Sequence, residues 1–253
     1  MCNTAASETK RIALDIEYDG TNYCGWQAQD NGNTVQQEIE RAIACLTGVQ
    51  VRIHGSGRTD AGVHALGQVA HFDTAASIPP EKFSFALNTH LPDDIRILAS
   101  YEVDEDFHAR FSAKGKHYRY VIRNAPHNSA LYRNRCMWVA RPLDFDRMRQ
   151  AAAFMVGEHD FATFCAAHTD VKDTVRRVSD IRLEKKGGYI MIDVWGNGFL
   201  RNMVRIMAGT LIAVGLGDIA AEDVPAIIGL KDRGRSGPTA DGCGLYLVEV
   251  IYE

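Results

Sequence analysis

The stretch HGSGRTDAGVHALGQVAHFD, residues 54–73, decides how the first part of the chain is expected to fold. It holds four glycines around a single Arg-x-Asp, formed by Arg58 and Asp60. Glycine allows sharp turns and close approach of a ligand, at an entropic cost. Apolar patterning predicts strands near 50–54 and 67–73, so the glycine-rich segment is the expected loop between them. This loop either turns the chain or binds something.

Outward from this loop, strands and helices alternate along the chain. The segment RIALDIEYDG (11–20) alternates apolar side chains at strand spacing. Thr34 and Gln37 form a predicted capping box for a helix over 34–48. The other expected elements are a short helix after Pro80, strands at 95–103 and 114–123, a helix capped by Asp144, strands at 175–184 and 189–195, helices near 199–214 and 222–229, and a last strand at 245–252.

This order of elements predicts an α+β fold of two similar mixed α/β halves, with a largely antiparallel sheet. The N-terminal half is expected to span 1–105 and to carry the Asp60 loop. The C-terminal half is expected to span 106–253, with an approximate boundary between them.

Composition narrows the class of protein. The chain has 253 residues, of which 46% are hydrophobic and 24% charged, as in an ordinary globular protein. No apolar run reaches the roughly 20 residues that span a bilayer, and the first residues lack the apolar segment of a signal peptide. The six cysteines are scattered without a C-x-x-C pair, which favours reduced thiols over disulfides or a zinc site. We therefore expect a cytoplasmic protein without membrane association.

Charge is unevenly distributed along the chain. The net charge is −4, but residues 107–150 hold ten basic side chains against two acidic ones, Asp144 and Asp146. A polyanion responds to the local field rather than to the total charge, so this stretch is a candidate nucleic-acid surface. A solvated basic face explains the charge equally well.

Three interpretations of the glycine-rich loop compete. A phosphate loop or a dinucleotide fingerprint requires a lysine or a third glycine that the segment lacks at the needed position. A structural turn with a salt-bridged Asp60 is one remaining alternative. The other is a presented carboxylate, with small neighbours leaving room for a flat ligand, that acts as a nucleophile or general base.

Two further segments carry chemistry. The expected helix near 199–214, within FLRNMVRIMAGTLIAVG (199–215), is apolar nearly all round, with Arg201 and Arg205 one turn apart on the remaining strip. A buried guanidinium needs a partner, and an Asp would serve, although a purely structural ion pair is equally compatible. In the expected strand 116–123, Tyr118 shares a face with Tyr120, either as core or as a base-stacking surface.

These segments together resemble one known family. GRTDAGVHA (57–65) resembles the signature of the TruA family of tRNA pseudouridine synthases. Further motifs resemble that family in the same order: YDGTNYCGWQ (18–27), DFHARFSAKGKHYRY (106–120), HDFATF (159–164), GFLRNMVRIMAG (198–209) and GLYLVEVIY (244–252). The resemblance covers nearly the whole chain, and departs from it only at Asp241 and Cys243, in a loop.

The resemblance implies a pseudouridine synthase fold with two halves flanking a basic RNA-binding cleft. It implies isomerisation of uridine at positions 38, 39 and 40 of the tRNA anticodon stem-loop by a homodimer, without cofactor or metal. Asp60 matches the catalytic Asp, Tyr118 the active-site Tyr, and Arg205 the Arg that pairs with the Asp. Arg58 matches the residue that holds the target base out of the helix, and Leu245 an apolar residue of the uracil pocket. The other expected substrate-binding residues are Phe107, His108, Arg110 and Phe111.

Two other functions remain open. A catalytically silent tRNA-binding or chaperone protein of the same fold would keep its function when Asp60 is replaced by Asn. A small-molecule enzyme would bind a free nucleotide with weak salt dependence, whereas RNA binding weakens steeply as salt rises. The polar run 166–173 is a candidate mobile loop over tRNA.

Overall fold

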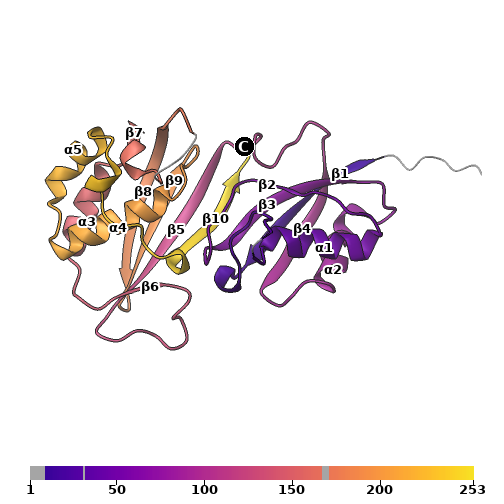
Figure 1. The fold of residues 1–253 in the computed structure, drawn as a ribbon, viewed down its shortest axis with the longest axis horizontal. Coiled ribbons are helices and arrows are strands. Elements are labelled where there is room, and N and C mark those ends of the chain that lie inside the picture. The colour runs from indigo at the N-terminus through magenta and orange to yellow at the C-terminus, as the bar shows by residue number, and fades with distance from the viewer. Residues whose placement is uncertain (1–8, 31, 167–170) are drawn as a thin grey trace, which may run out of the picture. The chain divides into compact units, whose positions relative to one another are not determined.

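The computed structural model describes residues 9–30, 32–166 and 171–253 (Figure 1). The chain divides into two compact units, one of Met1–Ala113 with Tyr252–Glu253 (unit 1) and one of Lys114–Ile251 (unit 2). Each unit packs helices on strands that pair mainly antiparallel, so the predicted α+β class is confirmed. The expected boundary between the two halves, at residues 105 and 106, stays a prediction from the sequence. Unit 1 of the structure continues to Ala113.

Unit 1 is built on the antiparallel strands β4–β1–β3, in that spatial order. These strands are β1 (Lys10–Tyr18), β3 (His64–Thr74) and β4 (Ile95–Val103), and the short β2 (His54–Gly55) pairs with β3. Ile12 lies opposite Phe72 in this register, and both are buried, because apolar residues alternate along the strands. The helices α1 (Val35–Thr47) and α2 (Phe83–Asn88) lie side by side in this unit (Figure 1).

Helix α1 begins and ends where the sequence predicts. The Thr34 hydroxyl oxygen accepts from the Gln37 backbone N–H, and the hydroxyl donates to the Gln37 side chain over 2.7 Å. Gly48 ends the helix at a φ of 73°, in the left-handed region that glycine adopts without a Cβ penalty. Val35, Ile39 and other residues at helical spacing form its buried face.

Unit 2 is built on five antiparallel strands in the spatial order β10–β5–β9–β8–β7. Its elements are β5 (Gly115–Asn124), β6 (Met137–Val139), α3 (Phe145–Ala153), β7 (Gly157–Asp160), β8 (Val175–Lys186), β9 (Tyr189–Gly196), α4 (Met203–Leu216), α5 (Val224–Gly229) and β10 (Leu245–Ile251). The short β6 runs parallel to β5. Helices α3, α4 and α5 lie together within unit 2, with α3 packed on α4 and on β8 (Figure 1).

Several expectations from the sequence were wrong in detail. The strand expected over 50–54 is reduced to His54–Gly55, and the short strands β6 and β7 were not foreseen. Helix α4 begins at Met203 rather than near residue 199 because Asn202 has a φ of 62°, which cannot continue a right-handed helix. Arg201 therefore lies outside the helix and is exposed, and only Arg205 belongs to it.

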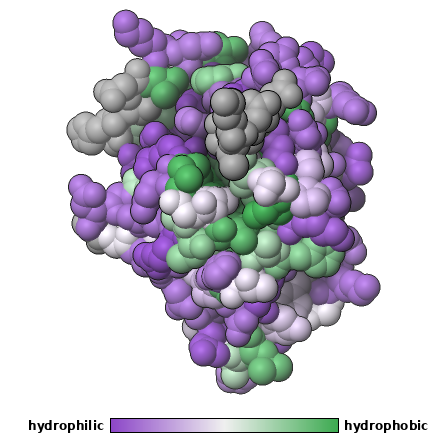
Figure 2. Space-filling view, turned by 90° about the vertical axis from the view of Figure 1, so that its right-hand side faces the viewer, coloured by the Kyte–Doolittle hydropathy of each residue, from purple (hydrophilic) through white to green (hydrophobic). Residues whose placement is uncertain are grey.

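The surface of the molecule mixes hydrophilic and apolar residues. Figure 2 shows one face, on which hydrophobic residues gather near the middle and hydrophilic ones surround them. Among the large apolar side chains that unit 1 exposes are Phe85 on α2 and Leu98 on β4. In the part of the chain that the structure describes, no helix is both long enough and apolar enough to cross a bilayer.

Candidate active site and RNA-binding surface

The glycine-rich loop follows β2 and leads into β3, and its backbone is held on both sides. Ser56 N–H donates to the Val69 carbonyl over 2.7 Å, and Trp26 N–H donates to the Thr59 carbonyl over 3.0 Å. Within the loop, Val63 N–H donates to the Asp60 carbonyl over 3.2 Å. These bonds satisfy the backbone without regular secondary structure, so the loop is an ordered turn.

The glycines here make room for protein as much as for a ligand. A Cβ on Gly55 would lie 2.6 Å from the Trp26 ring, so this glycine accommodates an indole rather than a base. Gly62 has a φ of 74°, which an L side chain rarely adopts. Outside the loop, a Cβ on Gly25 would lie 2.4 Å from the Thr59 carbonyl oxygen. The interpretation of the glycines as space for a ligand is therefore wrong at Gly55.

Side chains alternate in direction around Asp60. Thr59 is buried, whereas Arg58 is exposed and Asp60 is half-buried. The Arg58 Nε donates to the Gln27 side-chain oxygen over 3.0 Å, and the Gln27 amide donates to the Gln36 side-chain oxygen over 2.8 Å. The loop thus carries an exposed guanidinium and a half-buried carboxylate on a backbone that is hydrogen-bonded at Ser56 and Thr59.

One segment of unit 1 combines side chains that pack inside the unit with side chains that are exposed. It contains Phe107, His108, Arg110 and Phe111. Phe107 packs against Tyr252 with ring centroids 5.2 Å apart. Arg110 and Phe111 are exposed, Phe111 to 75%, and the guanidinium lies 5.5 Å from the neighbouring ring centre. A cation beside an exposed aromatic ring is the combination that contacts nucleic-acid phosphates and bases.

His108 belongs to a histidine cluster with His54 and His71 in unit 1. The ring centroid of His71 lies 5.2 Å from that of His54 and 4.7 Å from that of His108. The cluster lines a cavity of about 410 Å³ together with Arg11 and Arg52. Burial, followed by the charges of His108 and Arg11, lowers the pKa of His71 to about 4, so His71 is neutral at pH 7.

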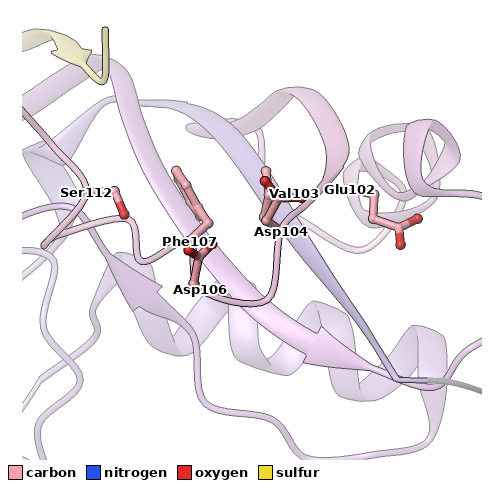
Figure 3. Close-up of a pocket in the computed structure, with 6 residues that line it drawn as sticks. All are labelled: Glu102, Val103, Asp104, Asp106, Phe107 and Ser112. Atoms are coloured by element: carbon pink, nitrogen blue, oxygen red, sulfur yellow. The ribbon is translucent and has the colours of Figure 1, made fainter.

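A second cavity in unit 1, of about 400 Å³, is acidic (Figure 3). Glu102, Asp104 and Asp106 line it with Val103, Phe107 and Ser112. Phosphates carry negative charge, so this lining disfavours RNA. Phe107 therefore borders the acidic cavity and, along the chain, precedes the exposed Arg110 and Phe111.

Unit 2 places two of the expected site residues on neighbouring strands. Tyr118 lies on β5, is 8% exposed, and meets the Phe199 ring edge-on with centroids 5.1 Å apart. Leu245 begins β10 opposite Tyr120 and is also nearly buried. The direct pairing of β5 with β10 brings Tyr118 and Leu245 into the same part of the unit.

Arg205, the third site residue in unit 2, is held from the first turn of α4. Its Nε donates to the Ala240 carbonyl over 2.8 Å, and a terminal nitrogen donates to the Asn202 side chain over 3.3 Å. Helix α4 can approach this segment closely because a Cβ on Gly209 would lie only 1.8 Å from the Pro238 carbonyl oxygen. The close contact between the α4 backbone and the segment of Pro238 and Ala240 thus fixes the position of the Arg205 guanidinium.

The opposite face of β5 is occupied by internal contacts. Asp193 accepts from Arg119 over 2.9 Å and contacts His117 Nε2 over 2.6 Å. The His117 ring stacks on Trp195 with centroids 4.1 Å apart. Arg119, one of the ten basic residues of the stretch 107–150, therefore already has a carboxylate partner.

Comparison with known proteins shows the family of this chain. The profile of the family described as tRNA pseudouridine synthase matches residues 16–112 and 151–253. The chain belongs to this family. The tRNA pseudouridine synthase A of Acetivibrio thermocellus is 53% identical over 243 residues, covering 96% of this chain and all of that protein. The proteins of the same name from Ruminiclostridium cellulolyticum and Geotalea uraniireducens are 52% and 51% identical, each over 96% of this chain and all of that protein.

One solved structure, a Cbf5-Nop10-Gar1 complex, covers 94% of this chain and 49% of the matched chain at 12% identity. The TM-score of 0.39 is too low to support an argument. Membership of the tRNA pseudouridine synthase family rests on the sequence relatives and the family profile.

Sequence reasoning missed the residues that support the loop of this synthase family member. Tyr18, Ser56 and Gln68 are buried around the loop, and Gln27 holds Arg58. No spacing in the sequence marks them, because they meet the loop only after the strands pair. Within 9–30, 32–166 and 171–253, no three His, Cys, Asp or Glu side chains are grouped to hold a metal ion. Four of the eight residues of the candidate loop 166–173, residues 167–170, lie outside the described residues.

Proposed function

We propose that this protein isomerises uridine to pseudouridine at positions 38, 39 and 40 of the tRNA anticodon stem-loop, with Asp60 as its catalytic carboxylate. The observation that carries the proposal is Asp60 itself, half-buried on an anchored loop within the motif GRTDAGVHA. Membership of the tRNA pseudouridine synthase family supports the reaction and the substrate class.

The reaction exchanges one glycosidic bond for another. The C1′–N1 bond of uridine breaks, the uracil turns over, and a C1′–C5 bond forms, while C5 loses a proton and N1 gains one. Asp60 begins this exchange by attack on C1′, by attack on C6 of the ring, or by abstraction of a ribose proton. Each route uses a carboxylate and conserves atoms and electrons, so the exchange needs no oxidant or energy source.

The other site residues supply orientation and charge. We assign Arg205 as a further catalytic residue because it stands in the motif GFLRNMVRIMAG, and its guanidinium supplies positive charge. Tyr118 stacks on the target base and is the candidate to take the C5 proton, and Leu245 lines the uracil pocket. Extrusion of the base costs a few kcal/mol. Arg58 offsets part of this cost by holding the base out of the helix.

RNA outside the pocket binds the basic segment 107–150. The exposed Arg110 and Phe111 support this assignment, as does the surplus of basic residues there. His108 contributes through the histidine-lined cavity, and Phe107 anchors the segment.

The assembly we propose is a homodimer in the cytoplasm. The exposed apolar side chains of unit 1, such as Phe85 and Leu98, support an interface. The cysteines at 24, 45, 136, 165 and 243 are free thiols, which supports a reducing compartment. Light scattering during gel filtration tests the dimer, and a mass of one chain would contradict it.

Pseudouridine mapping on an unmodified tRNA transcript, with uridine at 38, 39 and 40, tests the function. Wild type is compared with Asp60→Asn, and with Asp15→Asn as a matched control on β1. The buffer contains a chelator and no nucleotide. We expect product from wild type and the control, and none from Asp60→Asn although it still binds tRNA.

A silent tRNA-binding protein gives a different outcome. In that case wild type binds tRNA but forms no pseudouridine at any of the three positions. A small-molecule enzyme instead binds a free nucleotide, with an affinity that changes little between low and high salt.

A further inference from the structure

A buried hydroxyl pair lies directly behind the Asp60 loop. The Tyr18 hydroxyl and the Thr59 hydroxyl are 2.8 Å apart, and the two residues are 3% and 8% exposed. Tyr18 is the last residue of β1, so its ring is carried by a strand paired on both sides. Thr59 is the immediate neighbour of Asp60. This single bond therefore links a rigid sheet to the residue before the carboxylate.

A buried amide holds the other side of the same loop. Gln68, on β3, is fully buried, and its side-chain oxygen accepts from the Ser56 hydroxyl over 2.6 Å. Its side-chain N–H donates to the Gly57 carbonyl over 3.0 Å. Gln68 is also one of the groups that act on the pKa of the buried Tyr18 phenol. The side chains of two adjacent strands thus form one buried network that reaches residues 56, 57 and 59.

This buried network acts on the geometry of the Asp60 loop and takes no direct part in the reaction. Burial raises the pKa of the Tyr18 phenol well above its usual range, so the hydroxyl stays neutral and keeps its hydrogen bond at any working pH. Neither Tyr18 nor Gln68 reaches solvent to touch a substrate. Thr59 is buried, whereas its neighbour Arg58 is exposed and its neighbour Asp60 is half-buried.

We propose that Tyr18 and Gln68 are positioning residues that fix the Asp60 carboxylate for catalysis by clamping Thr59, Ser56 and Gly57 to the sheet of unit 1. The inference rests on the proposed role of Asp60. A misplacement of about 1 Å at a reacting group can cost 10²-fold in rate, which is the scale on which loss of the clamp acts.

The test measures single-turnover rate constants at saturating enzyme, together with the tRNA dissociation constant, for Tyr18→Phe, Thr59→Val and the double variant. Each single change removes one hydroxyl of the same bond. We expect each to slow the reaction by about 10-fold to 100-fold, with tRNA affinity within about 2-fold of wild type. The rate constant of the double variant is expected to lie within about 3-fold of that of the slower single variant, because the effects of residues in contact are not additive.

Two controls separate positioning from general stability. Thr59→Ser keeps the hydroxyl and is expected to restore the rate to within about 3-fold of wild type. Tyr101→Phe removes a comparable hydroxyl, which donates to Asp15 over 3.1 Å, and is expected to leave the rate unchanged. Melting temperatures are recorded for every variant, and rates are measured well below the lowest of them.

Three results would overturn the inference. One is a wild-type rate in Tyr18→Phe, even with a lowered melting temperature, since this would make the clamp purely structural. Another is a double variant slowed by the product of the two single effects. The third is a loss of tRNA affinity at unchanged rate. If Asp60→Asn retains full activity, the proposed function fails instead, and that result is independent of Tyr18.

Discussion

Replacing Gly25 by Ala tests how closely the Asp60 loop depends on its packing. Gly25 has a φ of 95°, and an added Cβ would lie 2.4 Å from the Thr59 carbonyl oxygen and 3.1 Å from the Asp60 carbonyl carbon. Ordinary van der Waals contact begins at 3.4 Å, so residue 25 or the loop must move by about 1 Å. We expect the substitution to displace the backbone that carries the proposed catalytic carboxylate while leaving the Asp60 side chain itself unchanged.

The matched control is Gly48→Ala at the end of α1. Gly48 has a φ of 73° and nothing within 4 Å of an added Cβ, so it carries the backbone strain without the collision. A positive φ costs an alanine about 1–2 kcal/mol in either position. Gly25→Ala also loses the hydrogen bond from Trp26 to Thr59, worth about 1 kcal/mol more.

Urea unfolding and single-turnover pseudouridine formation are measured for both variants. We expect Gly48→Ala to lose about 1–2 kcal/mol of unfolding free energy at unchanged rate. Gly25→Ala should lose about 2–3 kcal/mol and slow the reaction by up to about 10²-fold. Equal rates for the two variants would refute the reasoning, because the loop would then tolerate displacement.

Three further predictions concern other parts of the molecule. Gly209→Ala places a Cβ 1.8 Å from the Pro238 carbonyl oxygen, so it should destabilise unit 2 by more than 2 kcal/mol in urea unfolding, roughly the cost of overpacking. Gly229→Ala adds a Cβ in open space and should not destabilise unit 2. Equal losses of unfolding free energy in the two variants would contradict the contact of Gly209 with Pro238. The pKa of His71 is lowered to about 4 from 6.5, so the unfolded chain binds the proton first and stability falls as pH drops from about 6.5 to about 4. The slope is at most about 1.4 kcal/mol per pH unit, and His71→Gln should flatten it in urea titrations at several pH values. Arg110→Ala should reduce the slope of log tRNA affinity against log salt concentration by about one. An unchanged slope would show that Arg110 is not part of the RNA-binding surface.

Much of the fold could be predicted because its signals are local. The capping box at Thr34 and the glycine at Gly48 bound α1 as predicted, since both act within one helical turn. Strand β1 followed from alternation of apolar residues. The start of α4 could not be predicted, because the left-handed backbone of Asn202 leaves no trace in an apolar helical pattern.

Local pattern also located the Asp60 loop but left its surroundings open. From the residues of the loop alone, Asp60 was either part of a structural turn or a presented carboxylate. The sequence left open whether the glycines serve a turn or a ligand, and the structure shows that Gly55 lies against the Trp26 ring. Which atom fills the space beside a glycine depends on residues distant in the chain.

The sequence by itself determined the family, the class of fold and the candidate residues, because motifs and periodicity are read along the chain. Only the tertiary structure decided what stands behind Asp60. Tyr18 meets Thr59 across 41 positions, and Gln68 reaches Ser56 across 12. These contacts require β1 and β3 to pair in one register, with Ile16 opposite Gln68. Strand register is a property of the folded sheet, so no local pattern could have named the clamp.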